Sequence, residues 1–153
     1  MPQDESKFIS ILRDARREYE AGSNDMAKGA ARPARGAALC AALQSPVVSG
    51  WVGRIYKLSS NSEGKGVLEL EVDPSSYVKT WNNALSDMAD ETLIEPSSRV
   101  FRKAVALKEG QWIKFSGTLI PDQTDCFKEG SVGLRGSIQE PEFIFKFSDV
   151  VPL

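Results

Sequence analysis

Residues 66–72, GVLELEV, show most clearly what kind of fold this chain forms. From Leu68 to Val72, apolar and acidic side chains alternate at every position. Successive side chains of an extended strand point to opposite faces, so the pattern predicts a strand with its apolar side chains inward and Glu69 and Glu71 outward. Turn-forming residues flank the segment on both sides.

Weaker alternation predicts further strands on either side of this one. They are expected at 47–56, 77–81, 112–120, 134–138 and 143–151, with a helix at 97–107 between the third and fourth strands. The last strand places Phe143, Phe145 and Phe147 on one face. This order predicts a mainly β (α+β) fold, a small OB-like antiparallel barrel. Periodicity does not show closure, so an open sheet or a sandwich is the alternative.

The N-terminal third has a helical period. Phe8, Leu12, Ala15 and Tyr19 recur on one side of a predicted helix at 5–21. A second helical segment at 25–43 is expected to be interrupted near Gly29 and Pro33. We therefore divide the chain into a helical arm, 1–46, and a β domain, 47–153. Since the apolar stripe of an isolated helix would face water, the arm is expected to pack on the barrel.

The composition is that of a globular protein, with 41% hydrophobic and 26% charged residues. No apolar run approaches the roughly 20 residues that span a bilayer. The net charge is −2, and residues 44–153 carry twelve Lys/Arg against fifteen Asp/Glu, a net −3. A mildly acidic domain has no general attraction for nucleic acid, so nucleic acid is not the expected partner.

Four segments resemble the strands of a known family. GWVGRI (50–55), GVLELEV (66–72), GQWIKFSGTLI (110–120) and PEFIFKFSDV (141–150) are similar to an OB-fold family of small bacterial proteins and lipoproteins, which is named for its likeness to tRNA-anticodon-binding domains. The resemblance covers about 47–151 and implies a barrel. The function of that family is largely unassigned, and the family name reflects a fold analogy.

The compartment depends on the native start of the chain. The N-terminal residues do not resemble a signal peptide, so a native start at Met1 predicts a cytoplasmic protein. If an export signal was trimmed away, the protein is periplasmic or lipid-anchored, as the lipoprotein members of the resembling family suggest. Cys40 and Cys126 are either two unconnected thiols or one disulfide that ties the arm to a loop of the β domain.

Few residues suggest catalysis or metal binding. Histidine is absent, which removes the usual general base and the commonest zinc ligand. The acidic residues Asp87, Asp90, Glu91 and Glu95 lack the spacing of a calcium loop, so neither a metal nor a cofactor is predicted. A short basic patch, formed by Lys28, Arg32 and Arg35, is a candidate contact for an anion.

The candidate binding surface lies on the first and third strands, where aromatic and basic side chains interleave. It comprises Trp51, Arg54, Tyr56, Tyr77 and Lys79, with Trp81, Asn82 and Asn83 as a polar-aromatic lip at a strand end. An OB fold that binds single strands uses such rings to stack bases. The outward glutamates, Glu69 and Glu71, would repel phosphate there, and the competing interpretation is that most of these rings fill the core.

We therefore rank three functional hypotheses. The first is a non-enzymatic binding module for a protein, peptide or small ligand. The second is an OB domain that binds single-stranded nucleic acid. The third is an enzyme that works without histidine. The sequence fixes neither the ligand nor the oligomeric state.

Overall fold

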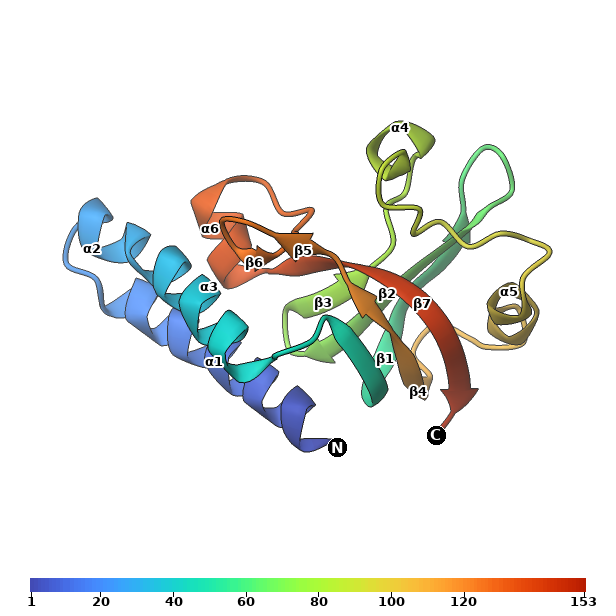
Figure 1. Ribbon diagram of the computed structural model, residues 1–153, viewed down its shortest axis with the longest axis horizontal. Coiled ribbons are helices and arrows are strands. Elements are labelled where there is room, and N and C mark those ends of the chain that lie inside the picture. The colour runs from blue at the N-terminus through green and yellow to red at the C-terminus, as the bar shows by residue number, and fades with distance from the viewer.

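The computed structural model describes residues 1–153 and has a mixed α+β fold (Figure 1). Three helices come first and lie together at one end of the molecule: α1 (Gln3–Ala21), α2 (Asp25–Gly29) and α3 (Ala31–Ala42). The five longer strands are β1 (Val47–Ser60), β2 (Gly66–Asp73), β3 (Ser76–Lys79), β4 (Trp112–Leu119) and β7 (Glu142–Pro152). The connections contain α4 (Ala84–Asp87), α5 (Arg99–Ala104), β5 (Pro121–Asp122), β6 (Cys126–Phe127) and α6 (Gly133–Gln139).

The five longer strands form one sheet in the order β1-β2-β3-β7-β4, and β4 pairs in turn with β1. The ring is uneven, because β1 has 14 residues and β3 only 4. Four of the five pairings are antiparallel, as expected, whereas β3 and β7 run parallel. Parallel neighbours need a long crossover, which here contains α4, α5, β4, β5, β6 and α6.

A bulge in β1 changes which alternate residues of the strand face the core. The pairing of β1 with β4 shifts register between Val48 and Trp51, where Gly50 adopts a φ of 67°. One extra residue in a bulged strand turns the following side chains to the other face. Val48, Trp51 and Ile55 are consequently all buried, which no single alternation along the strand allows.

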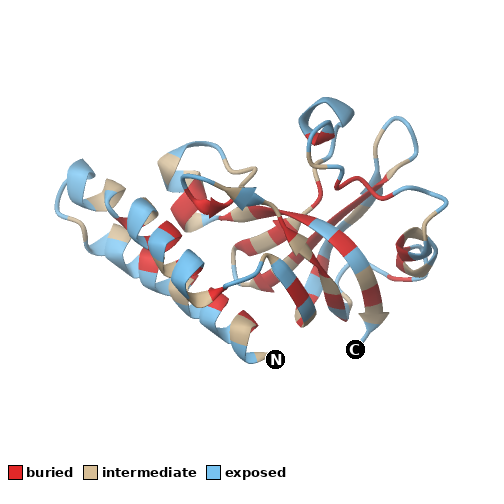
Figure 2. Ribbon diagram, in the orientation of Figure 1, coloured by how far each residue is buried: buried red, intermediate tan, exposed pale blue.

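The core is built around the last strand (Figure 2). Phe143, Phe145 and Phe147 are all buried, as their shared face predicts. Phe115 packs edge-on against the second and third of these rings, with centroids 5.4 and 5.8 Å away. The backbones also meet closely here, since a Cβ on Gly117 would lie 2.1 Å from the carbonyl oxygen of Lys146.

The helical arm shares this core. Phe8 and Leu12 of α1 and Leu39 of α3 are at most 1% exposed. The Phe8 ring lies 5.1 Å from both Trp51 and Phe143, measured between centroids. The arm therefore packs against the β domain through aromatic contacts, and α1 and α3 cover one flank of the sheet (Figure 1).

A buried carboxyl group lies at this junction. Glu5 of α1 is 0% exposed, and its Oε1 accepts a 2.8 Å hydrogen bond from the backbone N–H of Val52. Its Oε2 and the Nε1 of Trp51 have no hydrogen-bond partner. Burial, opposed by the Val52 hydrogen bond, raises the pKa of Glu5 from 4.5 to about 7. Below about pH 7 the protonated form of Glu5 is therefore favoured in the folded protein.

Replacement of Glu5 by glutamine is expected to make folding stability less dependent on pH. The folded pKa lies above the unfolded value, so the contribution of Glu5 is complete below pH 4.5 and is lost as the pH rises through about 7. One pKa unit corresponds to about 1.4 kcal/mol, so the loss is roughly 3 kcal/mol at most. Urea unfolding at several pH values measures it. This account is contradicted if the free energy of unfolding of Glu5→Gln depends on pH as strongly as that of wild type or of the exposed control Glu63→Gln.

Salt bridges fasten α3 to the segment that follows β5. Arg35 is 2% exposed; it donates to Glu129, to the carbonyl oxygen of Ser137 and to the hydroxyl of Ser137. Its guanidinium lies 5.4 Å from the centroid of the Phe143 ring. Arg32 forms two hydrogen bonds to Asp125, of 2.9 and 2.8 Å. These arginines of the predicted basic patch are thus structural.

Lys28, the remaining member of the patch, also has partners within the arm. Its Nζ donates to the carbonyl oxygen of Tyr19 and lies 4.8 Å from the centroid of the Tyr19 ring. The basic patch is therefore used inside the protein, although its acidic partners lie far away in the sequence.

Cys40 of α3 and Cys126 of β6 form a disulfide. The disulfide joins the arm covalently to the short β5–β6 hairpin. Arg32 holds the same hairpin without a covalent bond, through its hydrogen bonds to Asp125. The bond closes a sequence separation of 86 residues, and a long loop restricts the unfolded chain more than a short one does.

The disulfide can be tested by mass. In protein that is purified from an oxidising compartment, then unfolded without reductant, neither cysteine is expected to react with an alkylating reagent. Prior reduction should add two labels and serves as the positive control. Two labels on the unreduced protein would show that the thiols are free.

Several predicted elements differ from the structure. Residues 134–138, predicted as a strand, belong to α6, where Leu134 and Ile138 are four residues apart and share a helix face. Pro33 does not interrupt α3, because it lies in the first turn, where an N–H is not needed. The helix predicted at 97–107 is shorter, Arg99–Ala104, and is capped by Ser98.

Candidate functional site

A row of outward side chains crosses four strands of the sheet. Arg54 on β1 lies opposite Trp112 on β4 and opposite Glu71 on β2, and Glu71 in turn lies opposite Tyr77 on β3. Residues directly opposite on neighbouring strands share a face and lie close together. We call the surface around this row the outer face: Arg54, Tyr56, Glu69, Glu71, Tyr77, Lys79, Trp112 and Glu142.

Three aromatic rings occupy the outer face. Trp112 is 53% exposed and Tyr56 is 57% exposed, which is unusual for side chains of this size. The rings of Tyr56 and Tyr77 pack together with centroids 5.0 Å apart. Burial and then Glu71 raise the pKa of Tyr77, so its phenol remains neutral at physiological pH.

The charges of the outer face are mostly paired with one another. Arg54 contacts Glu71 at 3.2 Å, and the Lys79 Nζ lies 3.8 Å from Glu69 and 3.6 Å from Glu142. The outward glutamates expected from the sequence are thus the partners of the basic side chains. A negatively charged ligand would have to compete with these carboxylates for Arg54 and Lys79.

The structure brings together only part of the predicted binding surface. Arg54, Tyr56, Tyr77 and Lys79 all lie on the outer face. Trp51 does not, because it is 0% exposed and packs against Phe8 and Phe115 in the core. The prediction for Trp51 was therefore wrong: its ring fills the core, since the bulge at Gly50 turns it inward.

The predicted lip, Trp81, Asn82 and Asn83, follows β3 and belongs to the connection that contains α4. The indole N–H of Trp81 donates to Asp90, and Asp90 also accepts from Lys128. Asn83 caps α4 by accepting from the backbone N–H of Ser86. Trp81 and Asn83 therefore shape this connection, while Asn82 is exposed beside them.

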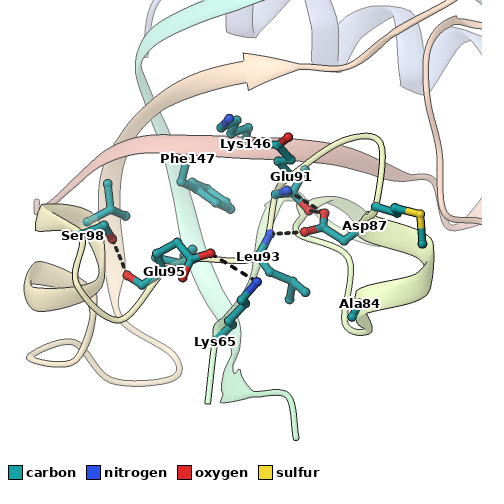
Figure 3. Close-up of a pocket in the computed structure, with 13 residues that line it drawn as sticks. Lys65, Ala84, Asp87, Glu91, Leu93, Glu95, Ser98, Lys146 and Phe147 are labelled. Atoms are coloured by element: carbon teal, nitrogen blue, oxygen red, sulfur yellow. Dashed lines mark hydrogen bonds and ion pairs between the residues drawn. The ribbon is translucent and has the colours of Figure 1, made fainter. Parts of the chain in front are cut away.

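A hollow of about 420 Å³ lies between this connection and β7 (Figure 3). Its floor includes Phe147 and Leu93, and Lys65 and Glu95 pair at its rim with a 3.2 Å contact. The buried Asp87 in its wall accepts from the backbone N–H of Leu93 and from the N–H and the hydroxyl of Thr92. Asp87 and the Lys65–Glu95 pair are thus engaged in contacts that hold the connection in place, while Glu91 and Lys146 also line the hollow.

The acidic residues near the hollow do not form a metal site. Asp87, Asp90 and Glu95 each have donors or cationic partners within the protein. No group of three His, Cys, Asp or Glu side chains is arranged to hold a metal ion. The structure thus assigns these carboxylates structural contacts.

Sequence reasoning missed two members of the outer face. Trp112 and Glu142 come from β4 and β7, and they join the face only through pairing with Arg54 and Tyr77. Trp112 stands at the start of a strand in which Ile113 and Phe115 face the core. Trp112 alternates with the inward-facing Ile113, and this alternation was the one signal in the sequence that its ring is exposed.

No protein-family model matches this chain, and a search of curated proteins finds no match. No helix combines the length and the apolar character that crossing a bilayer requires. Arguments about function therefore rest on the residues of the chain themselves.

Proposed function

We propose that this protein is a non-enzymatic binding module that holds its ligand on the outer face. The observation that carries this proposal is the exposure of two rings, Tyr56 and Trp112, with the half-buried Tyr77 packed against Tyr56, among charged side chains that are mostly paired. Exposed aromatic side chains are favoured at recognition sites because they combine a large apolar area with few rotatable bonds. The paired charges favour a ligand without net negative charge.

An OB-like fold is part of this proposal. A five-stranded ring with helices between its third and fourth strands supports it, since small OB barrels have five strands and bind ligands over strands 2 and 3. The resemblance of residues 47–151 to a family of bacterial OB-fold proteins and lipoproteins agrees with it. The disulfide favours an exported protein, because such bonds persist in oxidising compartments.

Two features support a binding role over catalysis. The chain has no histidine, and Asp87, Lys65 and Glu95 of the hollow beside α4 are engaged in contacts within the protein. A catalytic site needs acidic, basic or nucleophilic groups that are free to act on a substrate.

Single-stranded nucleic acid is the second candidate. It is favoured by Arg54 and Lys57, which flank the Tyr56 ring on β1, since basic side chains among stacking rings suit a single strand. It ranks second because Arg54 and Lys79 already have carboxylate partners.

The proposal is tested by screening the intact, disulfide-bonded protein against displayed peptides and immobilised glycans. Ligands that bind wild type are expected to bind Tyr56→Ala and Trp112→Ala at least about tenfold more weakly, as for the loss of a central ring. Leu85→Ala is the matched control, because Leu85 is 79% exposed on α4 and away from the outer face. Ligands that lose affinity only for Leu85→Ala would place the site elsewhere.

A further inference from the structure

The outer face offers neither of two common ways to hold a peptide. An extended peptide adds to a free strand edge, but Arg54, Glu71 and Tyr77 of the outer face are each paired with residues of two neighbouring strands. An anchoring side chain needs a pocket. Five hollows in the surface of the molecule are lined by other residues and do not include Tyr56, Tyr77 or Trp112.

What the outer face offers is a line of rings across the strands. The Tyr56 and Tyr77 ring centroids are 5.0 Å apart, and Trp112 lies opposite Arg54, two residues before Tyr56 on β1. The rings therefore come from three strands of one face. The C–H face of a sugar unit is apolar and packs on aromatic faces of this kind.

The polar groups between the rings suit hydroxyls. Arg54 pairs with Glu71 at the surface. Lys79, whose side chain is 13% exposed, lies between Glu69 and Glu142, whose side chains are 10% and 31% exposed. Donors and acceptors thus lie side by side, with a net charge of −1. A hydroxyl both donates and accepts, so it can bond to either member of a pair without displacing the other. An apolar ligand surface would instead strip water from these charges at a cost in free energy.

We infer that the ligand of the outer face is an uncharged oligosaccharide, stacked on Trp112, Tyr56 and Tyr77 and hydrogen-bonded to the ion pairs between them. This inference rests on the proposed binding function and names its ligand class. The OB fold is compatible with it, since barrels of this type bind oligosaccharides as well as oligonucleotides. The ion pairs supply hydrogen-bond donors and acceptors for the sugar hydroxyls, and the rings pack on the apolar faces of the sugar units.

The test is calorimetric titration of the intact protein with three soluble hexasaccharides, those of β-1,4-linked glucose, α-1,4-linked glucose and β-1,4-linked N-acetylglucosamine. At least one is expected to bind, and Trp112→Ala and Tyr56→Ala should each weaken it about tenfold or more. Leu85→Ala should leave the affinity unchanged. Because the ligand is neutral, raising the salt from about 50 to 500 mM should change the affinity less than about twofold. Circular dichroism verifies that the variants, which alter exposed side chains, are folded.

The possible results distinguish the oligosaccharide inference from the proposed binding function on which it rests. If none of the sugars binds, but displayed peptides bind in a way that Tyr56→Ala abolishes, the oligosaccharide inference fails and the binding function stands. If neither sugars nor peptides depend on the outer face, both fail. If a hexasaccharide binds equally to wild type, Trp112→Ala and Tyr56→Ala, the inference is wrong about the site.

Discussion

Replacement of Arg35 by alanine is expected to destabilise the fold by about 3–5 kcal/mol, because it leaves the Glu129 carboxylate buried without its cation. The side chains of Arg35 and Glu129 are only 1% and 2% exposed. Ser137 also loses the donors to its carbonyl and hydroxyl oxygens. Urea unfolding of the purified variant measures the loss as a lower midpoint.

Two comparisons make the Arg35 result specific. Arg17→Ala breaks an exposed pair with Asp14 in the same arm, so its expected effect is within about 1 kcal/mol. The double variant Arg35→Met/Glu129→Gln should recover part of the loss, since it leaves no unpaired charge. An Arg35→Ala effect as small as that of Arg17→Ala would mean that the buried pair does not fasten α3 to the β domain.

Phe145→Ala should cost about 3–5 kcal/mol, the range for truncation of a buried aromatic side chain. Phe145 is 0% exposed and packs between Phe115 and Phe147, with centroids 5.4 and 4.7 Å away. Ser148→Ala on the same strand is an exposed control and should change the free energy of unfolding by less than about 0.5 kcal/mol. A loss below about 1 kcal/mol for Phe145→Ala would place this face of β7 in solvent.

The sequence predicts the strands well where both faces of a strand differ in polarity. Leu68 and Leu70 face inward on β2, and the three phenylalanines of β7 are buried, because alternation reports which side chains face the core. It does not report exposure of the other face, since Glu69 is only 8% exposed. It fails at Trp51, since a bulge changes the parity and nothing in the alternation marks it. It fails again at residues 134–138, where so short a segment fits a helix and a strand equally well.

The contacts that define the arm and the outer face were beyond local sequence reasoning. Arg35 and Glu129 are 94 residues apart, and the basic patch looked unpaired because only sequence neighbours were visible. Trp112 reaches the outer face through its register with Arg54, and register depends on strand pairing in three dimensions. The exposed aromatic and basic residues of β1 and β3 were predicted, but the ion pairs that neutralise them were only partly implied by Glu69 and Glu71.

The central claim is that the outer face recognises its ligand through its rings and through the ion pairs of Arg54 and Lys79. Fluorescence anisotropy with a labelled single-stranded DNA at about 150 mM salt tests it most directly, since phosphate contacts dominate such binding and weaken steeply with salt. We predict no sub-micromolar binding, because stacking on Tyr56 and Trp112 alone contributes only roughly 1–3 kcal/mol per base. Sub-micromolar affinity that falls steeply with salt and is lost in Arg54→Ala or Lys79→Ala would contradict the account and make nucleic acid the ligand.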